Sequence, residues 1–123
     1  EMKGDMVKTV MEDVPDNLFN PDPYYQQGGD MVRVGGMTYA FNPLETMGKR
    51  VSDLRLGGKL IDPNKTYKVA GWAPVSEEAA KAGNPMVWDL VEQWLKARGG
   101  KVSARQPNMP KLTGAAPNPG LAS

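Results

Sequence analysis

The chain has 123 residues, a length that fits one domain with a hydrophobic core of its own. The formal net charge is +1 and Lys and Arg form no dense cluster, so nothing in the charge favours a nucleic-acid partner. The absence of cysteine and histidine excludes the commonest zinc and copper sites and most imidazole-based catalysis. No segment has the apolar length of a membrane span, so we expect no membrane partner.

The N-terminal end does not look like the start of a protein. Glu1 to Gly4 read like the middle of a chain, and no signal peptide opens the sequence. We therefore expect a piece of a longer protein, whose targeting signals lie elsewhere.

The first predicted element is a helix followed by a long loop. Apolar residues recur at helical spacing on one face, namely Met2, Met6, Val7, Val10, Met11 and Val14. Pro15 is predicted to end this helix, because proline removes a backbone donor and clashes with the preceding turn. Residues 15–30 then hold three prolines and two glycines, which predicts a loop. Long ordered loops are uncommon unless they serve a site.

A β region follows the loop. Strands are predicted over residues 31–34, 37–41, 50–56, 60–61 and 67–72, the last as a central strand because it is apolar on both faces. Gly57 and Gly58 predict a two-residue hairpin turn, since paired glycines supply the positive φ angles that such turns need.

Helices are predicted to complete the domain. Ser76 is a good N-cap for a short one, and Pro85 opens a second that Gly99 and Gly100 end. The order of elements predicts an α+β fold, with a mixed or antiparallel sheet and flanking helices, over residues 1–100. Residues 101–123 carry four prolines and no periodicity, which predicts an extended or disordered tail.

Two motifs carry a family resemblance. A Gly-Gly-Lys hairpin at 57–59 precedes Ile-Asp-Pro-Asn-Lys-Thr-Tyr-Lys-Val at 61–69. This pattern resembles the C-terminal domain of the 5′-nucleotidase family, over about residues 1–98. Residues 16–36, which include Asn-Pro-Asp-Pro-Tyr-Tyr-Gln-Gln-Gly-Gly-Asp at 20–30, together with Val-Ala-Gly-Trp-Ala at 69–73, resemble the thiosulfohydrolase branch of that family, which serves sulfur oxidation by the Sox pathway.

The resemblance implies a hydrolase whose catalytic machinery lies outside this chain. Family members carry an N-terminal metallophosphoesterase domain with two metal ions, manganese in this branch, and with the catalytic Asp and His. The C-terminal domain covers those metals and completes the substrate pocket. The thiosulfohydrolase branch releases sulfate from a cysteine on the flexible C-terminal arm of a sulfur-carrier protein, in the periplasm. The resemblance thus implies no catalytic residue, metal ligand or cofactor in this chain, which alone is expected to be inactive.

Candidate substrate-binding residues lie mainly in the loop. Tyr24, Tyr25, Gln26 and Gln27 offer hydroxyl and amide groups without fixed charge, and Gly28 and Gly29 let a substrate backbone approach closely. The alternative is that the two tyrosines only fix the loop to the sheet.

Two further candidates lie outside the loop. Arg33 can bind an oxyanion through its guanidinium, or form a structural pair with Asp30 or Asp53. Trp72 can line the pocket mouth or be buried in the core. Scattered aspartates fit no calcium-loop spacing, so no metal site is predicted.

Two other functions stay open at this stage. One is the C-terminal domain of a plain 5′-nucleotidase or phosphoesterase, although the Gly-Gly-Asp-Gly-Tyr segment usual in nucleotidases is not present. The other is a non-catalytic module that only recognises the carrier protein.

Overall fold

The computed structural model describes residues 1–71, 83–104 and 108–115. The chain divides into two compact units, one formed by Glu1–Lys68 with Pro107–Ser123 and the other by Val69–Gln106. The described residues 108–115 belong to the first unit, whereas the predicted boundary assigns residues 101–123 to a tail of their own.

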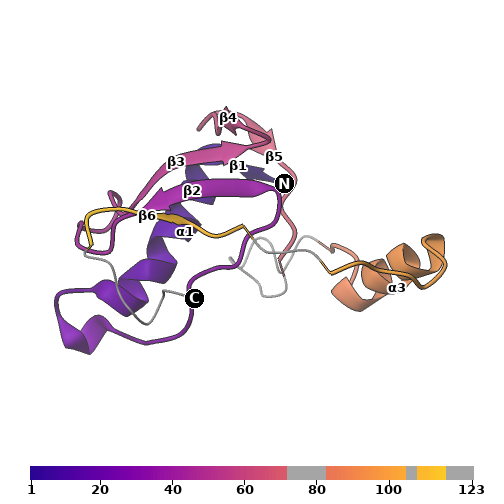
Figure 1. Ribbon diagram of the computed structural model, residues 1–123, viewed down its shortest axis with the longest axis horizontal. Coiled ribbons are helices and arrows are strands. Elements are labelled where there is room, and N and C mark those ends of the chain that lie inside the picture. The colour runs from indigo at the N-terminus through magenta and orange to yellow at the C-terminus, as the bar shows by residue number, and fades with distance from the viewer. Residues whose placement is uncertain (72–82, 105–107, 116–123) are drawn as a thin grey trace. The chain divides into compact units, whose positions relative to one another are not determined.

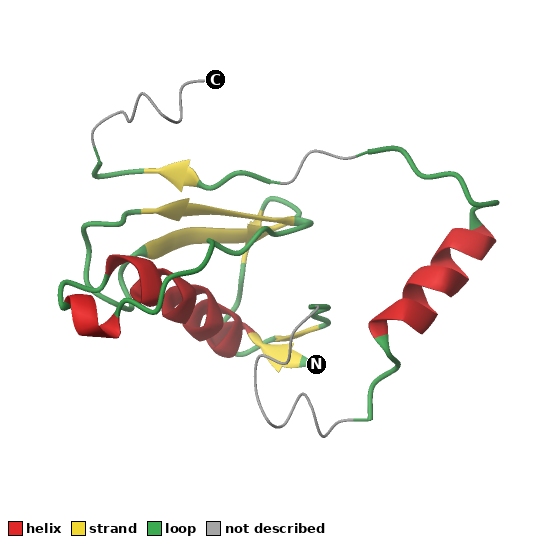
Figure 2. Cartoon of the chain, turned by 90° about the horizontal axis from the view of Figure 1, so that it is seen from below, coloured by secondary structure: helices red, strands yellow, loops and turns green. Residues whose placement is uncertain are grey.

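The first unit is a helix packed on a small sheet, as Figures 1 and 2 show. The sheet has the order β4-β3-β2-β6, and α1 contacts β3. The bounds are α1 Gly4–Phe19, η1 Pro23–Tyr25, β2 Met37–Phe41, β3 Val51–Leu56, β4 Lys59–Leu60 and β6 Lys111–Leu112. A separate two-stranded sheet pairs β1 (Met2–Lys3) with β5 (Thr66–Tyr67). The predicted α+β class is confirmed.

The hairpins of the sheet follow the predicted turn chemistry. β2 pairs antiparallel with β3, and β3 pairs antiparallel with β4 across Gly57 and Gly58. These glycines have φ angles of 57° and 80°, the left-handed region that a side chain would disfavour. The turn therefore brings β4 back beside β3.

The core lies between α1 and one face of the sheet. Its buried members come from the helix, from the strands and from the segment before β2, namely Val7, Met11, Val34, Tyr39, Phe41, Val51 and Leu54. Each fully buried side chain of this size contributes about 1.5–3 kcal/mol relative to exposure. With so small a core, the position of α1 on the sheet depends on polar contacts as well as on apolar packing.

Helix α1 begins against the turn that precedes β5. The N–H groups of Gly4 and Asp5 donate to the carbonyls of Lys65 and Pro63, at 3.0 and 3.1 Å. These bonds satisfy donors that the first turn of a helix leaves without partners. A Cβ on Gly4 would collide with the Asp62 carbonyl oxygen and lie 2.7 Å from Ile61 Cγ2, so only glycine fits this approach.

The predicted end of the helix at Pro15 is wrong. α1 continues to Phe19 with Pro15 inside it, and the loop therefore begins at residue 20. A proline inside a helix costs roughly 3 kcal/mol. Pro15 is itself fully buried, and polar contacts of Asp16 and Phe19 hold the last turn, which offsets that cost.

Two predicted strands differ from the structure. Residues 31–34 form no strand, and only Val34 makes an isolated bridge, to Asn108. The predicted central strand over residues 67–72 is wrong for 68–71, because β5 ends at Tyr67 and pairs with β1 alone. Trp72 and the predicted helix at Ser76 lie outside the described residues.

The predicted tail takes part in the sheet. β6 pairs parallel with β2, and the Asn108 side-chain amide donates to the Met37 carbonyl at 2.7 Å. Thr113 donates its backbone N–H to the Phe41 carbonyl at 2.8 Å. Of the two predicted states of the tail, this part is extended, and its pairing with the free edge of β2 is a contact that periodicity could not reveal.

The second unit contains α3 (Val87–Ala97), close to the helix predicted to open at Pro85. Gly99 and Gly100 end it as expected, with N–H groups that donate to the carbonyls of Lys96 and Leu95. Arg98 lies over the Trp94 ring, 4.5 Å from its centre. Within the described residues, no helix is long and apolar enough to cross a membrane.

Gly4 provides a test of the contact between α1 and the turn at 62–65. Gly4→Ala is expected to destabilise the unit by about 1–3 kcal/mol, the usual cost of overpacking, measured as a fall in the urea midpoint. The matched control is Gly35→Ala, since an added Cβ there meets no atom within 4 Å. Equal stability of the two variants would show that α1 does not approach Asp62 this closely.

Two tyrosine hydroxyls provide a second test. Tyr39 Oη is buried without a hydrogen-bond partner among the described residues, and burial raises the pKa of this phenol. Tyr67 Oη instead accepts the Asp62 N–H at 2.9 Å. Tyr39→Phe is expected to leave the melting temperature unchanged or higher, whereas Tyr67→Phe should cost about 0.5–1.5 kcal/mol. The reverse order would contradict the assigned contacts.

Candidate functional site

A buried carboxylate joins α1 to the start of β3. Glu12, only 3% exposed, accepts the N–H groups of Gly48 and Arg50 on Oε2 at 3.0 and 3.2 Å. Its other oxygen accepts the Val51 N–H at 2.8 Å. A buried charge of this kind is tolerated only when hydrogen bonds satisfy it, so these bonds fix the position of residues 48–51 against the helix.

A buried guanidinium makes the return contact to the end of the helix. Arg50 is 1% exposed, and its Nη1 donates to Asp16 Oδ1 at 2.6 Å. Its Nη2 donates to the Phe19 carbonyl at 2.9 Å. Asn20 Nδ2 donates to the second oxygen of Asp16 at 2.8 Å. The hydrogen bonds from Arg50 and then from Asn20 hold the pKa of the Asp16 carboxyl below its usual value.

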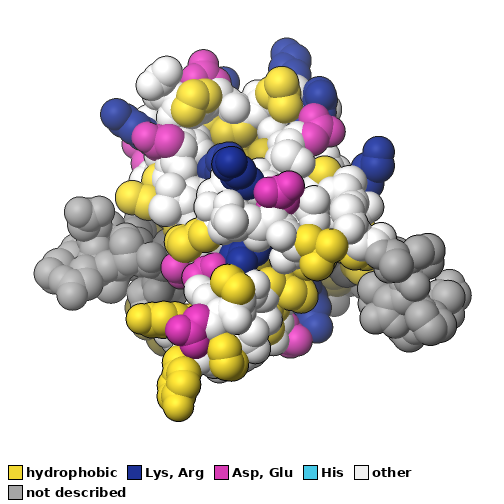
Figure 3. All heavy atoms as spheres, turned by 90° about the vertical axis from the view of Figure 1, so that its left-hand side faces the viewer, with side chains coloured by type: hydrophobic (Ala, Val, Ile, Leu, Met, Phe, Trp, Pro, Cys, Tyr) yellow, Lys and Arg dark blue, Asp and Glu magenta, His cyan; other side chains and the backbone are white. Residues whose placement is uncertain are grey.

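The candidate residues follow this helix end, in a segment that we call the tyrosine loop (residues 20–29). The Asp22 side chain accepts the Tyr24 N–H at 3.0 Å and begins η1. The tyrosine side chains point into solvent, with Tyr24 95% and Tyr25 65% exposed. They therefore do not fix the loop to the sheet. Figure 3 views the molecule from the left-hand side of Figure 1. It shows hydrophobic side chains over the lower part of that side, where η1 and the end of α1 lie.

The rest of the tyrosine loop is held by the backbone. Gln26 Nε2 donates to the Asn20 carbonyl at 2.7 Å, and the Gly28 N–H donates to the Asn17 carbonyl at 3.0 Å. Gly28 and Gly29 have φ angles of 80° and 109°, and a Cβ on either would meet no atom within 4 Å. The two glycines thus leave their backbone open to another chain, and their conformation disfavours any side chain.

The remaining candidates are not brought to the loop by any described contact. Arg33 is exposed, and its possible partner Asp53 pairs instead with Arg55 at 2.8 Å. Trp72 lies outside the described residues, so its predicted role stays a prediction.

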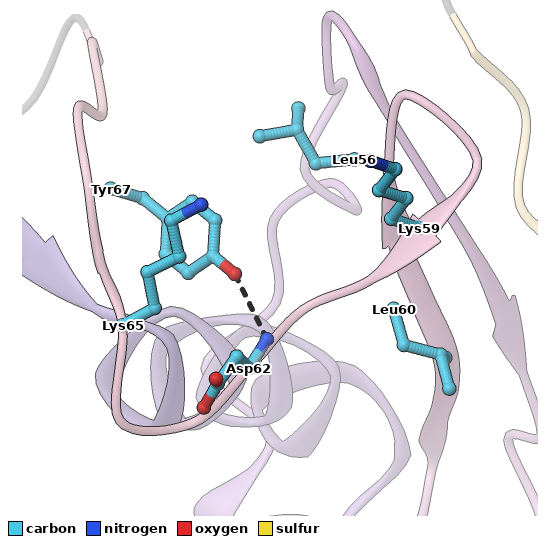
Figure 4. Close-up of a pocket in the computed structure, with 6 residues that line it drawn as sticks. All are labelled: Leu56, Lys59, Leu60, Asp62, Lys65 and Tyr67. Carbon is cyan, nitrogen blue, oxygen red and sulfur yellow. Dashed lines mark hydrogen bonds between the residues drawn. The ribbon is translucent and has the colours of Figure 1, made fainter.

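A hollow of about 280 Å³ lies at the other end of the first unit, lined by Leu56, Lys59, Leu60, Asp62, Lys65 and Tyr67. Figure 4 shows the Tyr67 hydroxyl against the Asp62 N–H and the Lys65 side chain beside the ring. Its lining includes none of the predicted substrate residues. The hydrogen bond from the Asp62 N–H to Tyr67 Oη holds two of the lining residues together and is a structural contact.

The described residues do not fit a catalytic metal pair. They contain no group of three or more acidic side chains that could hold a metal ion.

Glu12, Asp16, Asn20 and Arg50 are the residues that sequence reasoning missed. The apolar pattern gave no signal for them, because a helical period places Glu12 opposite the predicted apolar face. Spacing along the chain does not reveal a partner 34 or more residues away.

The sequence model of the 5′-nucleotidase C-terminal domain matches residues 1–78. The chain belongs to this family. No protein of curated function matches it by sequence.

A solved structure is similar to this 5′-nucleotidase C-terminal domain over nearly its whole length. It is described as Thermus thermophilus sulfate thiohydrolase SoxB in complex with glycerol, with 30% sequence identity and a TM-score of 0.67. The similarity covers 94% of this chain and 22% of that one, so the chain spans about a fifth of the length of SoxB.

The Asp16 contacts predict a pH dependence for this 5′-nucleotidase C-terminal domain. Because the folded pKa lies below the ordinary 3.8, the carboxylate contributes stability above that pH, and the contribution is lost as the pH falls through the folded pKa. Asp16→Asn should therefore lower stability near neutral pH and flatten its fall between about pH 5 and pH 2, measured by urea unfolding. Asp13→Asn, on the exposed side of α1, is the control and should keep the wild-type slope.

Proposed function

We propose that this chain is the substrate-binding C-terminal part of a periplasmic hydrolase that releases sulfate from a cysteine on a sulfur-carrier protein. The hydrolase's catalytic domain, with its two manganese ions, would be the chain's first partner, and the carrier's flexible C-terminal arm its second. Family membership and the likeness to a sulfate thiohydrolase support this proposal.

The observation that carries the proposal is the tyrosine loop. It holds two exposed tyrosines in a hydrogen-bonded turn, followed by two glycines whose backbone is open. A flexible carrier arm needs a narrow surface with neutral hydrogen-bonding groups, since fixed charges would trap its anionic end. The loop offers phenol and amide groups of this kind.

The reaction needs no external oxidant or reductant. A water oxygen forms a bond to the sulfonate sulfur and the sulfur–sulfur bond to the carrier breaks. The electron pair stays on the carrier's sulfur, and sulfate leaves with the proton balance made up by solvent. This chain's part would be to orient the sulfonate and exclude competing water, which are the contributions of positioning groups.

Two loop variants test this proposal in the chain joined to its catalytic domain. Tyr25→Phe and Gln27→Ala should each lower kcat/KM for sulfate release from the carrier conjugate by up to about 10²–10³, the cost of one lost transition-state donor. The free energy of unfolding should change by less than about 0.5 kcal/mol, because both side chains are on the surface.

The control for Gln27→Ala is Gln93→Ala, an exposed glutamine on α3. It should keep wild-type turnover. Normal turnover of both loop variants would refute the loop as the substrate site. Hydrolysis of nucleotides in preference to the carrier conjugate would favour the plain nucleotidase, and no hydrolysis of either would favour a recognition module.

A further inference from the structure

The tyrosine loop is connected to the buried interior by hydrogen bonds that begin at Arg50. Its guanidinium is fixed by Asp16 Oδ1 at 2.6 Å and by the Phe19 carbonyl at 2.9 Å. Phe19 is the last residue of α1, so the arginine holds the helix end from which the loop departs. A planar fork of donors can make both contacts at once, which lysine cannot.

From Asp16 the connection continues without a break into η1. Asn20 Nδ2 donates to Asp16 Oδ2 at 2.8 Å, and Asn20 Oδ1 accepts the Asp22 N–H at 3.0 Å. Asp22 Oδ1 in turn accepts the Tyr24 N–H at 3.0 Å. The Asn20 carbonyl also accepts Gln26 Nε2 at 2.7 Å. Asn20 is therefore the junction between the core and the exposed turn.

The core does not need this turn. η1 contributes no buried side chain, and Tyr24 and Tyr25 are mostly exposed. Ordering the exposed residues of η1 costs conformational entropy, and no apolar burial of their side chains offsets that cost. Order of this kind is useful where side chains must be held ready for a ligand, since preorganisation removes that cost from binding.

We propose that Arg50 and Asn20 are positioning residues, which hold Tyr25 and Gln26 of the tyrosine loop in the arrangement that receives the substrate. This inference rests on the proposed function. Arg50 is 1% exposed and acts through Asp16 and Asn20, without contact to the substrate.

The decisive variant is Asn20→Asp, which keeps the size and the acceptor for the Asp22 N–H. It removes the donor to Asp16 and sets two carboxylates against each other, so the connection to Arg50 is cut at one point. In the isolated chain, the backbone order parameters of residues 24–26 should fall from about 0.85 to below about 0.6 on the picosecond-to-nanosecond scale. The melting temperature should fall by less than in Arg50→Lys, because Asn20 supplies one part-buried hydrogen bond to Asp16, whereas the buried Arg50 bonds both Asp16 and the Phe19 carbonyl.

In the chain joined to its catalytic domain, Asn20→Asp should lower kcat/KM for the carrier conjugate by about tenfold to a hundredfold, chiefly through KM. Arg50→Lys should have the same effect, with a fall in stability as well. The control is Arg55→Lys, which alters the exposed pair with Asp53 in the same way and should leave turnover unchanged.

The outcomes separate this inference from the proposed function. Unchanged order parameters in Asn20→Asp overturn the inference. Normal turnover of Asn20→Asp with impaired turnover of Tyr25→Phe overturns the inference and leaves the proposed function standing. Normal turnover of both variants refutes the substrate role of the loop, and with it the positioning role.

Discussion

The burial of Glu12 and Arg50 between α1 and β3 is the constraint on which the first unit depends. In the described part of the chain the apolar core has seven buried members, and non-directional burial permits the helix to slide or rotate on the sheet unless directional contacts oppose this. The carboxylate of Glu12 accepts three backbone N–H groups that belong to residues 48, 50 and 51. Its hydrogen bonds therefore set the register of α1 against the start of β3, because displacing either element would leave a buried charge without partners.

The same constraint explains why the helix runs past a proline. Pro15 has no N–H to donate to the Met11 carbonyl, and a free helix would be expected to end there. Arg50 binds Asp16 and the Phe19 carbonyl, which is one of the four carbonyls that a helix end leaves without partners. The helix end is thus held by the residue that directly precedes β3, and the tyrosine loop begins from a fixed point.

The fixed end of α1 determines where the tyrosine loop begins and so how its exposed side chains are presented. Tyr24 and Tyr25 lie in solvent on a turn that side-chain hydrogen bonds of Asp22 and Asn20 hold together. The stability of this unit and the arrangement of its candidate site therefore share residues. Substitutions at Arg50 are expected to affect both, whereas substitutions at Asn20 are expected to affect chiefly the loop.

The sequence by itself determined the family, the α+β class, the glycine hairpin and the loop that carries the candidate residues. These depend on local signals, namely periodicity, turn chemistry and contiguous motifs, which are complete within a few residues. It did not determine the end of α1, the pairing of β6 with β2, the short extent of β5, or the contacts of Arg50. Each of these is decided by a partner far away in the chain, as Arg50 is for Asp16 and Asn108 for Met37. Only the tertiary structure brings such partners together. Buried charges and free strand edges must be hydrogen-bonded, and the group that satisfies them depends on the fold, which the spacing of residues along the chain does not reveal.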